Sequence, residues 1–564
     1  MFEVTFKVQD GADVIIRAAA RDNLLELARR AGIDIDAPCG ANGVCGKCLV
    51  RVVSGDVTSE PSRHIGDEAY AAGWRLACCS AIDGDALIEV PASASSFKTG
   101  IQTAGLASKQ EQALYSAAIG AIFSAGVERG CEETGPGAAI DIGTTTVAAA
   151  LLDLQTGELL SKSSAGNAQI RYGADVINRI IASTREGGRA ALRAAILDET
   201  LIPLISELSA DAGVALSDMT RCVVAGNTTM EHLFLGEDAE SIRLEPYEPA
   251  FLEKTGLTAQ DAGLPFRIGS RLILAPNVGS YVGGDITSGV LTSMIWDMDG
   301  LHLLIDLGTN GELVLGNRDF LLCCACSAGP AFEGGEITCG MRAAAGAIES
   351  VRIDADTMTP ALGVIGDGKT LPAGICGSGL IDLVAELFRC GLIDASGKFT
   401  GVSGRVRRDE YGGASYIVAF AHESAAGRDI VIDETDIDNF IRAKAAVFSA
   451  IRAMLNSLDM TVEMLDSVQI AGGIGSGIRI SNAVTIGMLP ALPEEKYSYA
   501  GNTSLTGACA MLLSGDAADK VFDLGRNMTY LELSSHPGYM DEFVAACFLP
   551  HTDARLFEPA GSST

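Results

Sequence analysis

The sequence predicts a multi-domain protein, with a small α+β domain at its amino end and a larger, internally duplicated α/β part behind it. The chain has 564 residues, which is more than one hydrophobic core usually serves. Residues 2–9 alternate apolar and polar side chains, as a half-buried strand does, and a cysteine-rich loop follows. Further on, an apolar strand that ends in Asp-x-Gly-Thr occurs twice, which indicates duplication.

Composition and charge restrict the classes of function. Hydrophobic residues make up 48% of the chain and charged residues 20%, which excludes a disordered chain. The formal net charge is -31, so neither nucleic acid nor an anionic membrane is expected as a partner. The amino terminus lacks the features of a signal peptide, and no apolar run is long enough to cross a bilayer. We therefore expect a cytoplasmic protein whose 15 cysteines are metal ligands or buried thiols.

The small domain is expected to span residues 1–92. A helix is predicted from Asp22 or Asn23, either of which can cap it, through Arg30, with Gly32 as its stop. Alternating or apolar runs between turn residues predict four strands, at 2–9, 13–17, 49–53 and 86–90. Together these elements predict a β-grasp-like fold.

The rest of the chain divides by composition. Residues 93–136 are expected to form a linker, within which the Ala-rich stretch 108–127 forms a helix. From about Gly137, short apolar runs, glycine turns and long helical patterns alternate, as they do in α/β domains. We expect this larger domain to occupy residues 137–550, and a C-terminal tail to occupy residues 551–564.

Four cysteines of the small domain form the strongest motif in the chain. A Cys-x5-Cys-x2-Cys run with glycines between its members is followed later by Arg-Leu-Ala-Cys. Iron–sulfur clusters need thiolates that converge on a small volume, and glycines let the backbone wrap closely around it. Three close cysteines and one distant one favour [2Fe–2S] over zinc, which usually takes two Cys-x2-Cys pairs. The alternative is a structural loop or a zinc knuckle.

The same segment resembles the plant and adrenodoxin type of ferredoxin. The resemblance implies a [2Fe–2S] cluster whose ligands are Cys39, Cys45, Cys48 and Cys78. Cys79 competes for the fourth position; the Leu-Ala-Cys register of the resemblance favours Cys78 and leaves Cys79 as a core residue.

The repeated strand–turn–strand unit indicates a phosphate site. Residues 138–146 and 303–311 both consist of an apolar strand, an Asp at its end and a Gly-Thr turn, and a second apolar strand follows. The N–H groups and hydroxyls of such a turn can bind phosphate oxygens, while the Asp can hold Mg²⁺ directly or through water. Two copies predict two halves with a cleft between them.

These hairpins resemble the phosphate loops of the actin/Hsp70/sugar-kinase ATPases. The resemblance implies ATP and Mg²⁺ between two RNase H-like lobes, with an adenosine motif at residues 470–476. Asp141 and Asp306 are then the catalytic candidates, and Glu333 is a candidate for orienting water, for which structural hydrogen bonding is the alternative. The implied nucleotide-binding residues are Gly143, Thr144, Thr145, Gly308, Thr309, Asn310, Gly472 and Gly473.

Two other patterns receive structural interpretations. Gly363–Thr370 matches the P-loop pattern GxxxxGK[ST], but a P-loop must open into a helix, and Pro372 follows almost at once. We expect a surface turn there. Cys323, Cys324 and Cys326 lie in an apolar run and are expected to be core thiols rather than a second metal site.

The whole combination resembles the reductive activators of corrinoid enzymes. Stretches that carry this resemblance are 226–230, 276–279, 283–285, 328–334, 340–342, 375–380 and 501–505. The resemblance implies an ATP-hydrolysing, electron-transferring activase that returns Co(II) corrinoid to Co(I) for methyl transfer. The implied partners are a corrinoid protein of a methyltransferase system and an external low-potential electron donor, and the family suggests a homodimer.

Three alternatives remain open at this point. The chain could activate another low-potential enzyme, such as a radical-type acyl-CoA dehydratase, although those activators carry a [4Fe–4S] cluster between subunits. It could be a sensor in which the oxidation state of the cluster gates nucleotide binding. A sugar kinase is the weakest alternative, because it leaves the small domain without a role.

Overall fold

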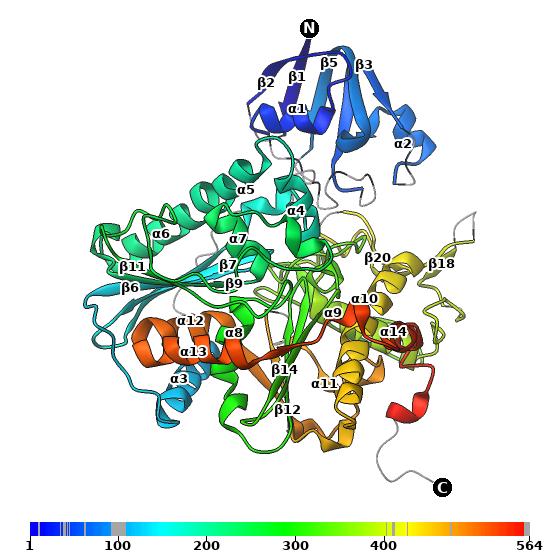
Figure 1. Cartoon of the computed structure of the whole chain (residues 1–564). Coiled ribbons are helices and arrows are strands. Elements are labelled where there is room, and N and C mark those ends of the chain that lie inside the picture. Colours follow the sequence, from blue (N-terminus) through cyan, green and yellow to red (C-terminus); the bar gives the residue numbers. More distant parts are fainter. Residues whose placement is uncertain are drawn as a thin grey trace.

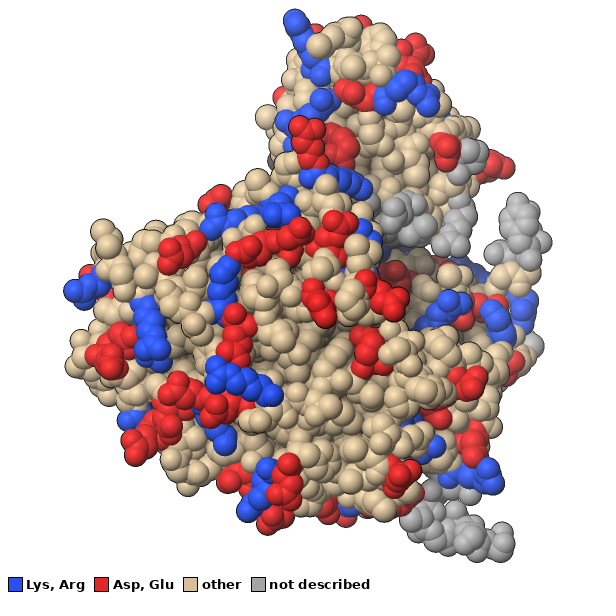
Figure 2. All heavy atoms as spheres, in the orientation of Figure 1, with Lys and Arg blue, Asp and Glu red and all other residues tan. Residues whose placement is uncertain are grey.

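In the computed structural model, a small amino-terminal domain stands on a larger body, as both the ribbon (Figure 1) and the space-filling view (Figure 2) show. No helix in the part of the chain that the structure describes is long and apolar enough to span a membrane. Residues 93–108 of the predicted linker and residues 558–564 of the predicted tail lie outside that part. The described residues are 1–9, 12–33, 35, 37, 41, 43, 46–60, 62, 64–91, 109–401, 403–408, 412–425, 427–473 and 477–557.

The small domain is a five-stranded sheet in the order β2-β1-β5-β3-β4, with the helix α1 (Leu24–Arg30) packed on it. The cap of α1 is Asn23, whose Oδ1 accepts hydrogen bonds from the N–H groups of Leu25 (3.0 Å) and Glu26 (3.2 Å). Its other elements are β1 (Phe2–Val8), β2 (Val14–Ala18), β3 (Leu49–Ser59), α2 (Asp67–Ala71), β4 (Trp74–Leu76) and β5 (Ser80–Val90). The predicted helix and four strands are confirmed, although β3 and β5 are longer than expected and β4 and α2 were not predicted.

The body contains two six-stranded sheets in which five strands share the same order and pairing, while the sixth strand lies at opposite edges. In the first, the hairpin of β6 (Pro136–Ile142) and β7 is joined along β6 to a parallel strand, β9. In the second, β12 (His302–Leu307) forms a hairpin with β13 and pairs in parallel with β21. This repetition confirms the duplication that the two Asp-x-Gly-Thr units predict.

The strand orders of the two sheets are β10-β11-β9-β6-β7-β8 and β22-β21-β12-β13-β14-β23. The remaining strands of these sheets are β7 (Thr146–Asp153), β8 (Leu159–Gly166), β9 (Arg221–Gly226), β10 (Leu257–Thr258), β11 (Arg271–Leu274), β13 (Gly311–Gly316), β14 (Leu321–Cys326), β21 (Ser467–Ala471), β22 (Tyr497–Gly501) and β23 (Thr529–Tyr530). Two three-stranded sheets complete the body and comprise β15 (Ala347–Ile353), β16 (Pro360–Val364), β17 (Gly374–Ile375), β18 (Val406–Arg408), β19 (Ala414–Ala419) and β20 (Ile430–Asp433).

Helices cover the sheets and also fill the space between them (Figure 1). One hydrophobic core joins both sheets through α8 (Gly284–Ser293) and α12 (Thr503–Leu513), which contact each other. The linker helix α3 (Lys109–Ser124) contacts both of them, so the predicted helix is confirmed over its described length. The other helices are α4 (Val176–Ser183), α5 (Gly188–Ile196), α6 (Ile202–Ala212), α7 (Thr228–Leu235), α9 (Gly377–Arg389), α10 (Glu434–Ser457), α11 (Ile480–Thr485), α13 (Gly515–Asn527) and α14 (Tyr539–Ala546).

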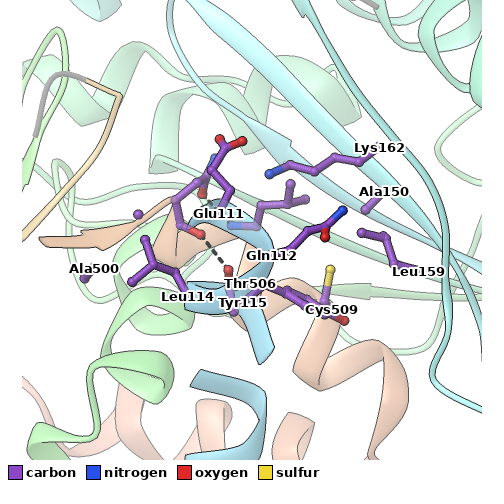
Figure 3. Close-up of a pocket in the computed structure, with 13 residues that line it drawn as sticks. Glu111, Gln112, Leu114, Tyr115, Ala150, Leu159, Lys162, Ala500, Thr506 and Cys509 are labelled. Carbon is purple, nitrogen blue, oxygen red and sulfur yellow. Dashed lines mark hydrogen bonds between the residues drawn. The ribbon is translucent and has the colours of Figure 1, made fainter. Parts of the chain in front are cut away.

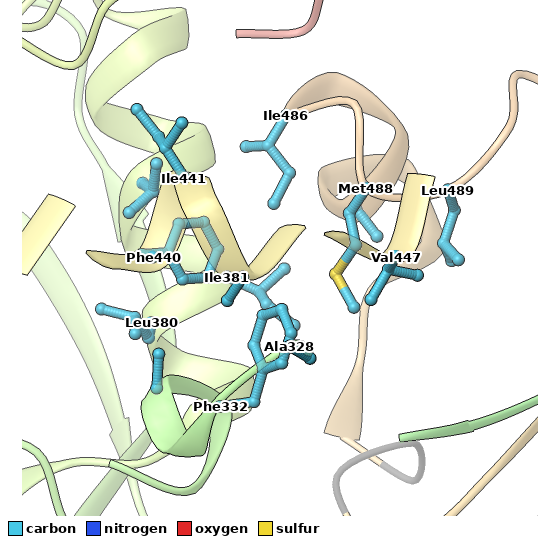
Figure 4. Packing of buried hydrophobic residues seen from close by; sticks show 14 of the residues in the cluster. Ala328, Phe332, Leu380, Ile381, Phe440, Ile441, Val447, Ile486, Met488 and Leu489 are labelled. Atoms are coloured by element: carbon cyan, nitrogen blue, oxygen red, sulfur yellow. The ribbon is translucent and has the colours of Figure 1, made fainter. Parts of the chain in front are cut away.

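The largest core lies in the second half of the body, where α9 and α10 pack together (Figure 4). Phe332 lies in a short 3-10 turn, Pro330–Glu333, and its ring meets that of Phe440 of α10 edge to face at 5.7 Å. This aromatic contact fixes the turn against the long helix. The side chain of Glu333, the next residue, therefore starts from a rigid position.

The structure also answers the questions about the P-loop pattern and the cysteine run. The stretch after β16 is an exposed turn in which Asp367 Oδ1 accepts from Lys369 N–H (3.1 Å), and the next helix begins only at Gly377. Cys323, Cys324 and Cys326 are buried in β14. Both structural interpretations are confirmed.

Candidate functional site

Two of the four expected cluster ligands lie in the described part of the small domain, and they face each other. The Sγ atoms of Cys48 and Cys78 are 3.2 Å apart and both residues are buried. The hydrogen bond with Cys48, burial and the neighbouring thiols raise the pKa of Cys78. Two thiolates this close need a cation between them, which a metal cluster supplies. Cys39 and Cys45 lie outside the described residues.

Cys79 lies close to the same place. Its Sγ is 3.6 Å from the Sγ of Cys78. A Cβ atom at Gly43, whose φ is +73°, would stand 2.6 Å from the Cys79 sulfur, so the loop and this thiol are in close contact. Cys79 is thus partly buried beside the cysteine loop, and the choice of Cys78 as the fourth ligand stays a prediction.

All eight residues predicted to bind the nucleotide line one cavity of about 510 Å³ between the two sheets of the body. It is lined by the β6–β7 turn, the β12–β13 turn and the end of β21. Asp141, Asp306 and Glu333 line it too. A cavity of this size and composition can hold a small, highly charged ligand such as a nucleotide.

Asp141 is held in place by the start of α12. Its Oδ2 accepts a hydrogen bond from Asn502 Nδ2 (2.9 Å), and its Oδ1 accepts one from Ser504 Oγ (2.8 Å). Asn502 also caps α12, because its Oδ1 accepts from Leu505 N–H (2.7 Å). The position of the Asp141 carboxylate is therefore set by the helix that packs between the two sheets.

Two further carboxyl groups join the predicted aspartates in the cavity, Asp285 at the start of α8 and Glu312 of β13. Burial and then the neighbouring acids raise the pKa of Asp306 to about 7 and that of Asp285 to about 8. Burial raises the pKa of Glu312 well above its ordinary range and also raises that of Asp141. So many acids around one cavity favour a cation there.

The acid cluster fits Mg²⁺ held through water. Among the described residues, no three Asp, Glu, His or Cys side chains are grouped to coordinate one ion directly. Mg²⁺ usually keeps several of its waters and binds through one or two carboxylates and the phosphates of its nucleotide. The arrangement therefore suits a hydrated Mg²⁺ that arrives with phosphate groups.

Glu333 joins the two phosphate-type turns. Its Oε2 accepts hydrogen bonds from Thr145 Oγ1 (2.6 Å) of the first turn and Thr309 Oγ1 (2.9 Å) of the second. The two threonine hydroxyls are themselves 2.8 Å apart. Glu333 thus lies where the two halves meet, and the hydrogen-bonding role expected as an alternative is observed.

The end of β21 comes very close to the second turn. Gly472 has a φ of +90°, and a Cβ atom there would stand 2.8 Å from Oδ1 of Asp306. Only glycine allows this approach without strain. Residues 474–476 of the expected adenosine motif lie outside the described residues, whereas Gly472 and Gly473 line the cavity.

A second, smaller cavity adjoins the first at Asn502 (Figure 3). It lies between α3, the β7–β8 hairpin and α12, and Tyr115, Lys162 and Cys509 line it. Its volume of about 40 Å³ is room for little more than a water molecule. It cannot hold a nucleotide, whereas the cavity between the two turns can.

Sequence reasoning identified the turns but missed acids that the fold brings to them. Glu312 immediately follows the second turn, and that adjacency was a usable signal. Asp285 stands in a Gly-Gly-Asp sequence at a helix start, a position where an acid is common for other reasons. Arg342 also lines the cavity and donates to the carbonyl oxygen of Thr145 (3.3 Å).

Known protein families match three consecutive parts of this chain. Three family models match: "2Fe-2S iron-sulfur cluster binding domain" over residues 7–83, "RACo middle region" over 136–298, and "C-terminal domain of RACo the ASKHA domain" over 300–560. The first supports the [2Fe–2S] cluster in the small domain. ASKHA denotes the actin, Hsp70 and sugar-kinase type of ATPase, so the predicted fold class is confirmed.

Two curated relatives match over most of their length. The corrinoid activation enzyme RamQ of Eubacterium limosum is 34% identical over 417 residues, which cover 72% of this chain and 69% of that protein. The [Co(II) methylated amine-specific corrinoid protein] reductase of Methanosarcina barkeri is 24% identical over 420 residues, covering 70% and 73%.

A solved structure matches nearly the whole chain. It is titled "Reductive activator for corrinoid,iron-sulfur protein" and is 39% identical to this chain. The match covers 99% of this chain and 100% of that one, with a TM-score of 0.70. The three consecutive domain matches, the two curated relatives and this structure all agree on one family. The chain belongs to the reductive activators of corrinoid proteins.

Proposed function

We propose that this chain uses ATP to drive electrons from a [2Fe–2S] cluster to the Co(II) corrinoid of a partner protein, and so regenerates Co(I) for methyl transfer. The observation that carries the proposal is the union of two sites in one chain: paired cysteine thiols in the small domain, and a carboxylate-lined cavity between two phosphate-type turns in the body. We assign the first site to residues 1–92 and the second to residues 137–550.

The cluster supplies a one-electron carrier when it is bound by Cys39, Cys45, Cys48 and Cys78. The close approach of Gly43 to the Cys79 sulfur supports this site, because it brings the loop and the thiols together. A cluster held there would supply the one electron that converts the partner's Co(II) to Co(I), and an external low-potential donor would then reduce the chain again. Reduction of Co(II) to Co(I) takes one electron and transfers no chemical group, so one electron from the donor balances each step.

An energy source is needed because Co(I) is a strong reductant. Plant-type ferredoxin clusters lie near about −400 mV, and a gap of ~200 mV to the corrinoid would disfavour transfer by roughly three decades. A ligand-driven closure of two lobes can offset a gap of that size only if it favours one state by a comparable free energy. The threonine–glutamate bridge between the two turns is a contact that a bound phosphate would rearrange.

The residues of the cavity then take separate roles. The N–H groups of the two turns, at Gly143–Thr145 and Gly308–Asn310, bind phosphate oxygens. Asp141 and Asp306 hold Mg²⁺ through water, and Gly472 and Gly473 let the nucleoside lie against the backbone. Glu333 is placed to orient the attacking water, because it already accepts hydrogen bonds at the junction of the turns.

The test is a visible spectrum of a purified corrinoid protein under anaerobic conditions with the reconstituted chain, a low-potential reductant and MgATP. We expect the Co(II) absorption to be replaced by that of Co(I) only when both reductant and ATP are present. The control replaces ATP with ADP. Co(I) formation at the same rate with ADP would contradict the role of ATP, and none with any corrinoid protein of a methyltransferase system would contradict the function.

A further inference from the structure

A side chain of α1, the longer of the two described helices of the small domain, contacts the body. Arg29 of α1 donates a hydrogen bond to the carbonyl oxygen of Arg171 in the body, and its guanidinium lies 5.8 Å from the ring centre of Tyr172. Only 16% of its side chain is exposed, and the guanidinium also pairs with Glu26 of the same helix (2.7 Å). Arg171 lies over the same ring at 5.2 Å. This contact is therefore a docking point, not a random approach of two surfaces.

The part of the body that receives Arg29 is the segment Asn167–Gly173 between β8 and α4, which contains a short 3-10 helix, Ala168–Arg171. It begins at Asn167, which is fully buried, and ends at Gly173. Gly173 is tied back by Arg179 of α4, whose Nε donates to its carbonyl oxygen (2.8 Å). Both ends of the segment are thus fixed inside the protein.

The same segment holds the backbone of the first phosphate-type turn. Asn167 Nδ2 donates to the carbonyl oxygen of Gly143 (2.9 Å). The backbone N–H of Asn167 donates to the carbonyl oxygen of Thr145 (2.9 Å). The carbonyl oxygen of Thr144, between them, accepts a hydrogen bond from Nη2 of Arg179. Three consecutive carbonyl groups of the turn therefore point toward the segment and its arginine.

These carbonyl bonds decide where the N–H groups of the turn point. In a planar trans peptide the C=O of one residue and the N–H of the next point in opposite directions. When the carbonyls of residues 143–145 point into the body, the N–H groups of residues 144–146 point the other way. Thr144, Thr145 and Thr146 line the cavity. The segment thus orients the N–H groups that would bind phosphate.

Arg179 adds charge to this arrangement. It is fully buried and makes hydrogen bonds to carbonyl oxygens and to Gln169 Oε1 (3.3 Å). Burial lowers its pKa to about 9, so it stays charged at neutral pH. A buried cation directly behind the turn favours an anion in front of it.

We propose that the segment Asn167–Gly173 serves two partners at once, orienting the first phosphate turn on one side and docking the small domain through Arg29 on the other, so that nucleotide binding and docking favour each other. Phosphate binding stabilises the outward-facing N–H groups, and hence the segment in the form that Arg29 contacts. By linkage, docking must then raise nucleotide affinity by the same factor. The inference rests on the proposed function only in taking nucleotide phosphate as the ligand.

The experiment measures equilibrium binding of a non-hydrolysable ATP analogue with Mg²⁺ to the full-length, cluster-loaded chain. We expect Arg29→Ala to weaken binding by about three- to tenfold, near the lower end of usual coupling between sites. The matched control is Arg30→Ala, which removes the neighbouring arginine of α1, bonded to Asp22 within the small domain (2.7 Å). Its affinity should equal that of the unaltered chain. The cluster spectrum of each variant shows whether the small domain is intact.

Two further measurements separate coupling from a local defect. In a double-mutant cycle, Tyr172→Leu should weaken binding as Arg29→Ala does, and the double variant should be no weaker than the worse single one. Small-angle scattering should show the unaltered chain and Arg30→Ala becoming more compact with nucleotide, and Arg29→Ala not.

The outcomes distinguish this inference from the proposed function. Equal nucleotide affinity in Arg29→Ala, Arg30→Ala and the unaltered chain would overturn the coupling while leaving the proposed function intact. Additive effects in the cycle would do the same. A chain that binds no nucleotide at all would overturn the proposed function and the coupling together.

Discussion

The acid cluster makes a quantitative prediction: Asp306→Asn should stabilise the metal-free body while it abolishes nucleotide use. Burial and the neighbouring Asp141 raise the pKa of Asp306 from 3.8 to about 7. Each pKa unit corresponds to about 1.4 kcal/mol, so the ionised form costs the fold up to about 4 kcal/mol. Water in the cavity screens part of this, and we expect about 2–4 kcal/mol.

The sign and the pH range follow from the direction of the shift. Because the pKa of Asp306 is higher in the folded chain than in the unfolded chain, the folded state favours its protonated form. The resulting destabilisation is absent below the unfolded-state pKa, grows as pH rises, and is complete above about 7. Asparagine cannot ionise, so its advantage over aspartate should be larger at pH 8 than at pH 5.5, by about 2 kcal/mol.

The assay is thermal unfolding of the metal-free, nucleotide-free chain at both pH values. At pH 8 we expect the Tm of the body to rise by roughly 2–5 °C in Asp306→Asn, taking about 1.2 °C per kcal/mol for a domain of this size. The matched control is Asp319→Asn, which makes the same change at an exposed position of the β13–β14 hairpin and should leave Tm unchanged. A gain that is absent, or that is equal at both pH values, would refute the electrostatic reasoning. The variant should also lose ATPase activity.

The remaining predictions concern the cluster, the water-orienting candidate and the docking contact. Cys45→Ser should abolish the [2Fe–2S] absorption and EPR signal, and a normal cluster in that variant would refute the ligand set. Cys79→Ser should keep both signals, and their loss there would move the fourth ligand to Cys79. Glu333→Gln should lower the rate of ATP hydrolysis by about 10²- to 10⁴-fold, as loss of a general base does, with nucleotide still bound; full hydrolysis there would leave Glu333 only its structural hydrogen bonds. Arg29→Ala should lower nucleotide affinity with an intact cluster spectrum, and unchanged affinity would contradict the coupling.

Local pattern was enough to predict much of the fold. Strict alternation at residues 2–9 predicts β1, and the capping by Asn23 predicts the start of α1, because both depend on neighbours in sequence. The second half of β3, Ser54–Ser59, is polar and was missed, since its pairing with β5 provides what its own side chains do not signal. Tertiary pairing decided the length of that strand.

The candidate site divides in the same way. Its turns were predictable because a repeated Asp-x-Gly-Thr carries its own chemistry, and Asp141 and Asp306 indeed line one cavity. Asp285 and Arg179 were not found, because a single acid at a helix start and a single arginine in a helix are common in any sequence. Only the fold shows that Asp285 lines the cavity and that Arg179 holds the backbone of the first phosphate-type turn.

The central claim is that electrons leave the cluster of this chain for cobalt when ATP is present, and a single-turnover measurement tests it most directly. The chain is reduced, freed of excess reductant, and mixed anaerobically with Co(II) corrinoid protein, with and without MgATP. We predict that with ATP one Co(I) forms at most per cluster, at the same rate as the cluster is reoxidised, and that without ATP neither change occurs. Co(I) formation without matching oxidation of the cluster, or cluster oxidation that is the same without ATP, would contradict the claim.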